Sequence, residues 1–310
     1  MARYVFGADI GGTTVKIGLL TETGEKVDFW EIPTRTEDHG VNIIPDIAKS
    51  IREKMKEKNI EDTQVIGAGV GVPGAVNADG LCHQAVNLGW EKVNVVNELH
   101  STLKLPVKAG NDANVAALGE AWKGGGQGYP NMCLVTLGTG VGGGIIIEGK
   151  ILTGAKGSGG EIGHIHLVDD EPETCGCGNH GCFEMYASAT GAVRLAKRLL
   201  ASTDEPSVLR EKDFECRDIF DAAKAGDSLA KKAAEQYGYY LGKGIAAVAS
   251  VVNPEIIVLG GGVSKAGDIL FDLLKPSFEK YVFPGCKDVK FALAKLGNDA
   301  GVYGAAKLLM

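Results

Sequence analysis

Residues 8–20 read ADIGGTTVKIGLL, and this stretch predicts the first structural unit of the chain. An apolar strand from Tyr4 ends in the acid Asp9, the pair Gly11-Gly12 is a turn signal, and a second apolar strand runs from Thr13 to Leu20. Such a turn offers backbone N–H groups and threonine hydroxyls, which can hold phosphate oxygens. Asp9 can hold magnesium, directly or through water. A single hairpin of this kind could equally be an ordinary β-hairpin.

The same pattern returns later in the chain. Residues 131–152, NMCLVTLGTGVGGGIIIEGKIL, again give an apolar strand, a Gly/Thr turn and an apolar strand, and LGGGVS at 259–264 adds a third glycine loop. Two hairpins in corresponding places favour a phosphate-binding role over two ordinary hairpins. Together they could grip the phosphates of a nucleotide from both sides, with the third loop supporting the adenine.

Composition limits the class of protein. The chain has 310 residues, 45% of them hydrophobic and 23% charged, which suits a folded protein of two ordinary domains. Its formal net charge of −7 and the lack of a basic tract argue against nucleic acid or an anionic membrane as a partner. The N-terminus does not resemble a signal peptide, and no apolar run reaches the ~18 residues of a membrane span. We therefore expect a cytoplasmic protein with reduced thiols.

Helical periodicity marks the connections between the strands. Residues 41–58, 184–201 and 227–250 are expected to be helical, and GNDANVAALGEAW at 110–122 is expected to enter a helix from a loop. The last residues, GNDAGVYGAAKLLM at 297–310, predict a helix that packs back on the first half. The chain thus divides into two related α/β halves near residue 115, and a ligand cleft between them is the default expectation.

Three of the seven cysteines lie within CGCGNHGCFE, residues 175–184. Reduced thiols at this spacing indicate a metal site rather than a disulfide cluster. Three thiolates and one imidazole would form a tetrahedral, closed site, which suits structural zinc. Either His164, eleven residues before Cys175, or His180 could supply the nitrogen.

The motifs carry a family resemblance. DIGGTTVK (9–16), TLGTGVGGG (136–144) and LGGGVS (259–264) resemble the phosphate and adenosine motifs of the actin/hexokinase/Hsp70 superfamily. GAKGSGGEIGH (154–164), followed by CGCGNHGCFE, resembles the ROK family of bacterial sugar kinases and repressors, and most of all its glucokinases. The resemblance follows almost the whole chain in motif order.

The resemblance implies a fold of two related ribonuclease-H-like (actin-like ATPase) domains with a cleft between them. The smaller would comprise residues 1–115 joined by a C-terminal helix at 298–310, and the larger would comprise 116–297 with the zinc-binding loop. It also implies ATP and Mg²⁺ as cofactors beside structural Zn²⁺. The expected nucleotide-binding residues are Asp9, Gly11, Gly12, Thr13, Thr14, Lys16, Thr139, Gly140, Gly261 and Gly262.

The resemblance also implies the sugar site. It favours His164 over His180 as the ligand that joins Cys175, Cys177 and Cys182. The expected sugar contacts are Gly74, Asn87, Asn111, Asp112, Glu161, His164 and Glu184. Asp112 would be the catalytic base, with Glu161 as the alternative; from the residues alone, Asp112 could simply be the N-cap of a helix that begins at Ala113. We expect the zinc ion to tie the segment of His164 to the segment of the three cysteines, and we call this link the zinc clamp. It should hold the sugar ligands, and the hairpins at 9–16 and 136–144 should lie outside it.

These features predict an ATP-dependent glucokinase that makes glucose 6-phosphate, the first step of glycolysis, and that works as a homodimer or tetramer. One alternative is a kinase for another hexose or N-acetylhexosamine, such as N-acetylmannosamine. The other is a sugar-responsive repressor, which the negative charge and the start of the first phosphate motif at Asp9 disfavour.

Overall fold

The computed structural model describes residues 3–211 and 213–310, and these form two compact units. Unit 1 contains the residues up to Pro130 together with Gly144–Gly160 and Lys295–Met310. Unit 2 contains Asn131–Gly143 and Glu161–Ala294. Both units are therefore assembled from segments that are distant in the sequence.

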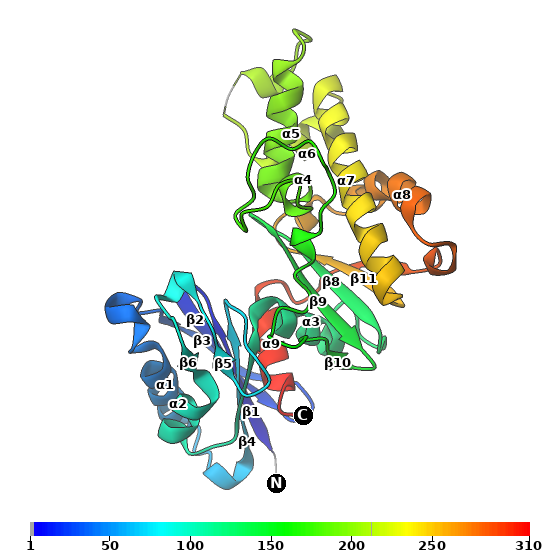
Figure 1. Ribbon diagram of the computed structural model, residues 1–310. Helices are drawn as coiled ribbons and strands as arrows, with labels where there is room; N and C mark the ends of the chain where they lie inside the picture. Colours follow the sequence, from blue (N-terminus) through cyan, green and yellow to red (C-terminus); the bar gives the residue numbers. More distant parts are fainter. Residues whose placement is uncertain (1–2, 212) are drawn as a thin grey trace. The chain divides into compact units, whose positions relative to one another are not determined.

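The first sheet has five strands in the order β3-β2-β1-β4-β7, and Figure 1 labels β1 to β4. Strand β2 is antiparallel to both β3 and β1, whereas β4 and β7 run parallel to β1. The bounds are β1 Tyr4–Ile10, β2 Thr14–Thr21, β3 Lys26–Pro33, β4 Val65–Val72 and β7 Val107–Asn111. A small separate sheet pairs β5 (Leu81–Cys82) with β6 (Val93–Asn94).

The second sheet repeats this plan in the order β10-β9-β8-β11-β12. Strands β10 and β9 are antiparallel, and β8, β11 and β12 are parallel. The bounds are β8 Met132–Leu137, β9 Val141–Ile147, β10 Lys150–Ile151, β11 Ile256–Gly260 and β12 Lys290–Leu293. The repeat expected from the two Gly/Thr hairpins is confirmed.

Alternation along β1 directs side chains to two different layers of unit 1. Phe6, Ala8 and Ile10 join a core with α1 (Ile43–Glu57) and α2 (Val95–Leu103). Val5 instead joins a second cluster with Ala306 of α9 (Ala300–Lys307). Strand β1 is thus buried on both faces, which fits its continuous apolar sequence.

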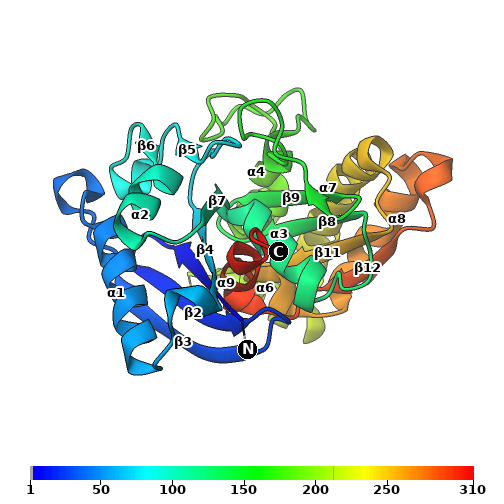
Figure 2. The same cartoon turned by 90° about the horizontal axis from the view of Figure 1, so that it is seen from below.

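Helix α9 approaches its neighbours at backbone distance. A Cβ added at Gly69 of β4 would lie 1.7 Å from the carbonyl oxygen of Ala305. A Cβ at Gly304 would lie 1.5 Å from the carbonyl oxygen of Val115, in α3 (Asp112–Lys123). Figure 2 shows α9 beside α3. The expected return of the C-terminal helix to the first half is confirmed, and glycine makes the close packing possible.

Helices of unit 2 pack around the 25-residue α7 (Ser228–Val252). The others are α4 (Glu184–Ala187), α5 (Ala189–Ala201), α6 (Cys216–Lys224) and α8 (Ile269–Tyr281). The single helix expected over 184–201 is wrong: it is broken at Ser188, whose extended backbone and side-chain bond from the Gly191 N–H cap α5. Short 3₁₀ turns complete the connections at Glu37–Gly40, Asp62–Gln64, Val86–Leu88, Ile162–His164, Val208–Arg210, Val263–Ala266, Pro284–Cys286 and Gly297–Asp299.

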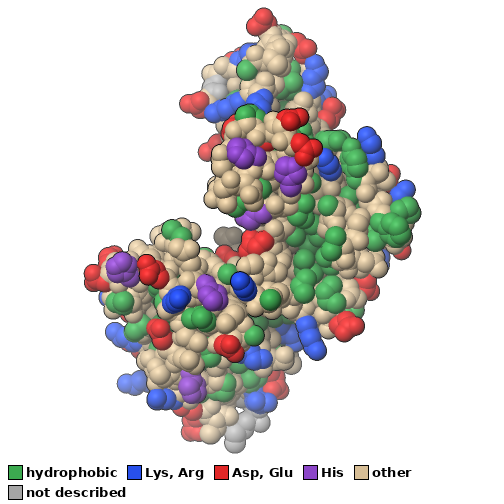
Figure 3. Space-filling model, in the orientation of Figure 1, with side chains coloured by type: hydrophobic (Ala, Val, Ile, Leu, Met, Phe, Trp, Pro, Cys, Tyr) green, Lys and Arg blue, Asp and Glu red, His purple; other side chains and the backbone are tan. Residues whose placement is uncertain are grey.

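Charge on the visible surface is mixed, with acidic and basic side chains interspersed and no broad basic field (Figure 3). None of the helices in the described part of the chain combines the length and apolar character that a membrane span requires.

Candidate active site and zinc centre

The first hairpin presents an open turn. The N–H of Gly11 bonds to the Thr14 carbonyl at 3.0 Å, which closes the turn, and Gly11 through Thr14 are exposed. A Cβ added at Gly12 would meet nothing within 4 Å. The turn expected to hold phosphate oxygens is therefore accessible and free of covering side chains.

Asp9 lies at the end of β1 beside this turn. Burial, reinforced by the negative charge of Asp112, raises its pKa to about 6, although Lys16 opposes the shift. A Cβ at Gly301 would lie 2.2 Å from one Asp9 oxygen, and a Cβ at Gly71 would lie 3.1 Å from the other. The carboxylates of Asp9 and Asp112 repel one another, and a divalent cation would relieve this repulsion. Their oxygens are the ligands that Mg²⁺ prefers.

Lys16 is less available than the sequence indicates. Its ammonium lies 2.9 Å from a carboxylate oxygen of Asp299 and 3.4 Å from the carbonyl oxygen of Asn298. This ion pair ties β2 to the turn that precedes α9. Lys16 would have to leave Asp299 to reach a phosphate.

The N-terminus of α3 holds Asn111 and Asp112. Asn111, not Asp112, is the N-cap, because its Oδ1 accepts from the backbone N–H of Asn114 at 3.1 Å. Asp112 is the first helical residue, and its Oδ1 accepts from Asn111 Nδ2 at 2.9 Å and from the Ala113 N–H at 2.8 Å. The interpretation of Asp112 as a mere N-cap is therefore wrong.

Two further expected sugar contacts also belong to unit 1. The carbonyl of Gly74 accepts from Asn111 Nδ2 at 3.2 Å, so Gly74 lies directly against the start of α3. Asn87 lies in the 3₁₀ turn Val86–Leu88 and is exposed. The structure therefore brings Gly74 together with Asn111 and Asp112.

The second hairpin turn, Gly138–Gly140, is held by α5. The N–H of Ala189 donates to the Gly138 carbonyl at 2.7 Å, and the hydroxyl of Thr190 donates to the Thr139 carbonyl. The first turn of α5 thus fixes the backbone of a loop whose Thr139 side chain is exposed. The sequence did not predict this contact between α5 and the turn.

The third glycine loop packs against the end of β8. Gly261 has φ +82°, and a Cβ there would lie 2.5 Å from the Leu137 carbonyl oxygen, immediately before the second turn. Beside this loop lies a cavity of about 400 Å³, a size that suits a small ligand. Its lining includes Ala189, Cys216, Phe220, Lys224, Gly262 and Val263. The sequence marked only Gly262 of these residues, because helix-borne lining residues carry no local motif.

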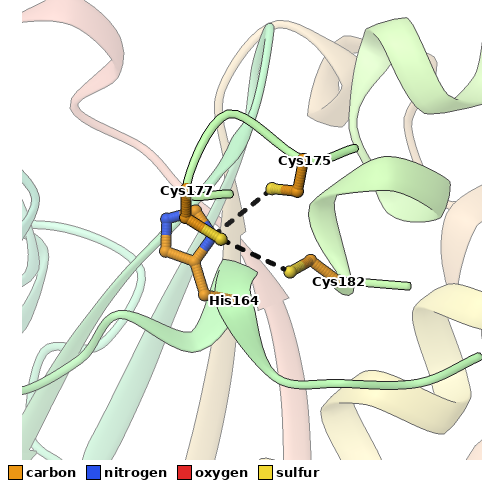
Figure 4. Close-up of side chains that lie close together, drawn as sticks. All are labelled: His164, Cys175, Cys177 and Cys182. Carbon is orange, nitrogen blue, oxygen red and sulfur yellow. Dashed lines mark hydrogen bonds between the residues drawn. The ribbon is translucent and has the colours of Figure 1, made fainter. Parts of the chain in front are cut away.

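The zinc centre is assembled as expected (Figure 4). One nitrogen of His164 and the sulfurs of Cys175, Cys177 and Cys182 all lie within 4.8 Å of one another. The Cys177–Cys182 sulfur separation and the Cys175 Sγ to His164 Nδ1 separation are both 3.7 Å. Four ligands around a tetrahedral Zn²⁺, with Zn–S near 2.3 Å, would lie about 3.8 Å apart. The alternative ligand His180 is elsewhere, with its Nδ1 2.9 Å from the Glu171 carbonyl.

The thiols show what a cation would change. Burial raises the pKa of Cys175 to about 12 and also raises the pKa of Cys182. The backbone N–H of Asn179 instead lowers the pKa of the exposed Cys177 thiol. A divalent cation stabilises thiolates and reverses the effect of burial, so the donor set fits zinc.

Glu184 connects the zinc centre to the second hairpin. Its Oε1 accepts from the Cys175 thiol at 3.0 Å and lies 3.7 Å from His164 Nδ1. Its Oε2 lies 3.4 Å from the backbone N of Val141, which begins β9. The expectation that the hairpin at 136–144 lies outside the zinc clamp is therefore wrong, because a side chain two residues after Cys182 reaches that hairpin.

Glu161 and His164 are held by one short turn. The His164 N–H donates to the Glu161 carbonyl at 3.2 Å around the 3₁₀ turn Ile162–His164. Gly163 packs on β9, where a Cβ would lie 2.1 Å from the Val141 carbonyl oxygen. Both the Glu161 and the His164 residues are exposed, so their polar groups are accessible on the same segment.

A buried carboxylate that the sequence did not reveal anchors the zinc loop, residues 165–182. The Glu171 side chain is 1% exposed and accepts two bonds from Arg198, at 2.7 and 2.9 Å. It also accepts from the Tyr186 hydroxyl. Arg198, with Tyr186, lowers the pKa of Glu171 to about 2. An isolated acid between metal ligands offers no sequence signal, because its partner lies 27 residues away.

Comparison with known proteins gives a consistent result. The model of the ROK family matches residues 5–310. A glucokinase of Halalkalibacterium halodurans is 45% identical, over 99% of this chain and 95% of that protein. An N-acetyl-D-glucosamine kinase of Vibrio cholerae is 32% identical, over 98% of both. A ROK family glucokinase from Streptomyces griseus, solved with glucose and AMPPNP, is 34% identical, with a TM-score of 0.76 and 98% of both chains covered.

Proposed function

Since the chain belongs to the ROK family and has the actin-like ATPase fold of its sugar kinases, we propose that it transfers the terminal phosphoryl group of ATP to the C6 hydroxyl of D-glucose. The product is glucose 6-phosphate. The observation that carries this proposal is the 45% identity to a glucokinase along 99% of the chain. The paired carboxylates beside the open turn of unit 1 and the hairpin-cavity arrangement of unit 2 supply the chemistry that such a transfer requires.

Sugar hydroxyls are recognised by carboxylates, amides and imidazole, which supply the required donors and acceptors. In unit 2 we assign this role to Glu161, His164 and Glu184. With Nδ1 of His164 directed at the thiols, its Nε2 remains for a hydroxyl. In unit 1 the corresponding residues are Gly74, Asn87, Asn111 and Asp112.

Asp112 is the proposed base. Phosphoryl transfer to a hydroxyl requires a group that accepts the hydroxyl proton. The Asp112 carboxylate is already oriented for this, because Asn111 and Ala113 both donate hydrogen bonds to its Oδ1. Asn111 caps the helix, so Asp112 does not have to do so. Glu161 is the alternative base, but its position beside His164 favours a role in holding the sugar.

The nucleotide is assigned to the two turns and the third loop. Gly11, Gly12, Thr13, Thr14, Thr139 and Gly140 offer N–H and hydroxyl donors for phosphates. The cavity beside Gly261 and Gly262 is large enough for a purine base. Mg²⁺ held at Asp9 would offset the charge that develops on the β- and γ-phosphates.

Zinc is assigned a structural role. Four protein ligands close the coordination sphere of a tetrahedral ion and leave no position for substrate. The ion would join the turn that carries Glu161 and His164 to the segment that carries Glu184. It would thereby fix sugar ligands rather than take part in the transfer.

A substrate panel tests the proposal. Purified protein with Mg-ATP should give its highest kcat/KM with glucose among glucose, mannose, N-acetylglucosamine and N-acetylmannosamine. The 32% identity to an N-acetyl-D-glucosamine kinase makes the acetylated sugars the sharpest competitors. A tenfold preference for either one, about 1.4 kcal/mol of transition-state binding, would contradict the assignment.

We also propose that the active form is a homodimer or tetramer in the cytoplasm. The division expected at residue 115 differs from the compact units of the structure, because α3 (Asp112–Lys123) lies wholly within unit 1, which runs to Pro130. Light scattering at assay concentrations tests the assembly, since only 32.4 kDa particles would refute it. The net charge of −7 and the mixed surface give no support to a DNA-binding repressor.

A further inference from the structure

Asn114 carries an unusual acceptor. Among the residues that the structure describes, its Oδ1 is the buried side-chain oxygen or nitrogen that lacks a hydrogen-bond partner. The residue is 2% exposed and lies two positions after Asp112 in the first turn of α3. Buried polar atoms are nearly always paired, so an unpaired one two residues after the proposed base requires an explanation.

The other atoms of Asn114 are engaged. Its backbone N–H donates to the N-cap oxygen of Asn111, and its Nδ2 makes a long bond of 3.5 Å to the Gly159 carbonyl. Gly144 of β9 closes over the residue, since a Cβ there would lie 3.3 Å from the Asn114 Cα. The amide is thus enclosed between α3, β9 and the glycine loop, residues 154–160.

The other side of the glycine loop packs closely against Val76. Gly157 has φ +83°, and a Cβ there would lie 2.5 Å from the Val76 carbonyl oxygen, which no side chain would permit. The carbonyl of Gly74, two residues before Val76, accepts from Asn111. The loop is closed at its base by the bond from the Gly159 N–H to the Thr153 carbonyl at 2.8 Å, and Glu161 follows it directly.

We propose that Asn114 is a positioning residue for phosphoryl transfer, which sets the glycine loop against the start of α3. Its Nδ2 holds the Gly159 carbonyl, and its Oδ1 receives a donor of the same loop when hexose binds. An amide is suited to this task because it carries a donor and an acceptor on one rigid plane. The clamp holds the glycine loop against the segment that begins with Asp112, and both belong to unit 1.

The inference rests on the proposed function, and its test separates the two. Asn114→Ala should lower kcat at least tenfold and raise the KM for glucose, while the Kd for ADP stays within twofold of wild type. Hydrogen–deuterium exchange at residues 154–160 should be faster than in wild type even without sugar, and glucose should no longer slow it. If the wild type did not phosphorylate glucose, the proposed function would fail, but the exchange of the sugar-free loop would still test the clamp.

Two further variants separate positioning from folding. Leu118→Ala removes a buried side chain from the same helix and should lower Tm without accelerating exchange at 154–160 or changing kcat. Asn114→Asp keeps the size of the side chain but replaces the donor to Gly159 with an acidic oxygen, and should also lower kcat and accelerate exchange at 154–160. Folded Asn114 variants with kcat and KM within twofold of wild type, or an equal loss of kcat in Leu118→Ala, would overturn the proposal.

Discussion

At the scale of single residues, Asn111 and Asp112 have separate tasks, the capping of α3 and the proposed role of base. Asn111 caps α3, and Oδ1 of Asp112 accepts from Asn111 Nδ2 and from the Ala113 N–H. Asp112→Asn should therefore keep the helix and the binding of glucose. Loss of the base should lower kcat by about 10²–10⁴-fold with little change in KM. Steady-state kinetics with calorimetry of glucose binding measures both, and a variant with wild-type kcat would leave Glu161 as the base.

Asp9 should make the protein sensitive to pH. Its pKa is raised from 3.8 to about 6, so the folded state favours the neutral acid. Stability should fall as the pH rises from about 4 to 6, and above 6 the buried charge should cost about 1–3 kcal/mol. Without Mg²⁺, Asp9→Asn should be more stable than wild type at pH 7.5 and equally stable near pH 4, although it should lose activity. Urea unfolding at both pH values decides this, and a variant less stable at pH 7.5 would exclude it.

At the scale of elements, the zinc loop has two independent attachments. One is the zinc centre, and the other is the buried pair of Glu171 with Arg198 of α5. Cys177→Ser should release zinc faster, loosen residues 155–184 and raise the KM for glucose strongly. Because Glu184 also reaches Val141, ADP affinity should fall as well, by a smaller factor.

Zinc analysis, calorimetry with ADP and circular dichroism of the folded variant measure these effects. Loss of a structural metal can unfold a domain, so the dichroism spectrum is the necessary control. A wild-type preparation without zinc, or a folded variant that kept its glucose KM, would refute this account. Cys286→Ser, a buried thiol outside the centre, is the matched control.

The Glu171 attachment should show a different pH dependence. Its pKa is lowered from 4.5 to about 2, so its contribution is complete above pH 4.5 and is lost as the pH falls towards 2. Glu171→Gln should destabilise unit 2 by about 2–4 kcal/mol at pH 7, since it leaves Arg198 without a buried partner. The difference from wild type should shrink at pH 3, measured by urea unfolding. An equal difference at both pH values would assign the effect to packing instead.

At the scale of the whole molecule, unit 1 depends on the last residues of the chain. α9 packs on Gly69 of β4 and presents Gly304 to α3, and both contacts are so close that only glycine fits at these two positions. Deletion of residues 300–310 should expose the apolar face of the first sheet and leave unit 1 unfolded. Limited proteolysis should then cut within the first 130 residues, whereas deletion of the exposed Met310 should have no effect. Protection of those residues in the truncated chain would contradict this.

Local signals account for what the sequence predicted well. The Gly/Thr turns between apolar strands, the spacing of the three thiols and the periodic helices each depend on neighbours in the chain. Long-range contacts account for what it did not predict. The Glu171 pair depends on Arg198, 27 residues away, and the contact of α5 with the second turn joins Thr190 to Thr139, 51 residues apart. The N-cap at Asn111 and the break at Ser188 are different, because each is a local cap in which a polar side chain accepts from the backbone N–H three residues on.

The late arrival of α9 also has a consequence for how the protein is made. Ribosomes add about 5–20 residues per second, and domains generally fold as they emerge, the N-terminal one first. Here the first sheet is synthesised early but must wait for residues 295–310 before its second face is covered. The order of completion is reversed: unit 2 can close once Ala294 has emerged, whereas unit 1 closes only after residues 295–310 have followed. For most of its synthesis the nascent chain carries an uncovered β-sheet, which makes it a natural client for chaperones that shield apolar surface.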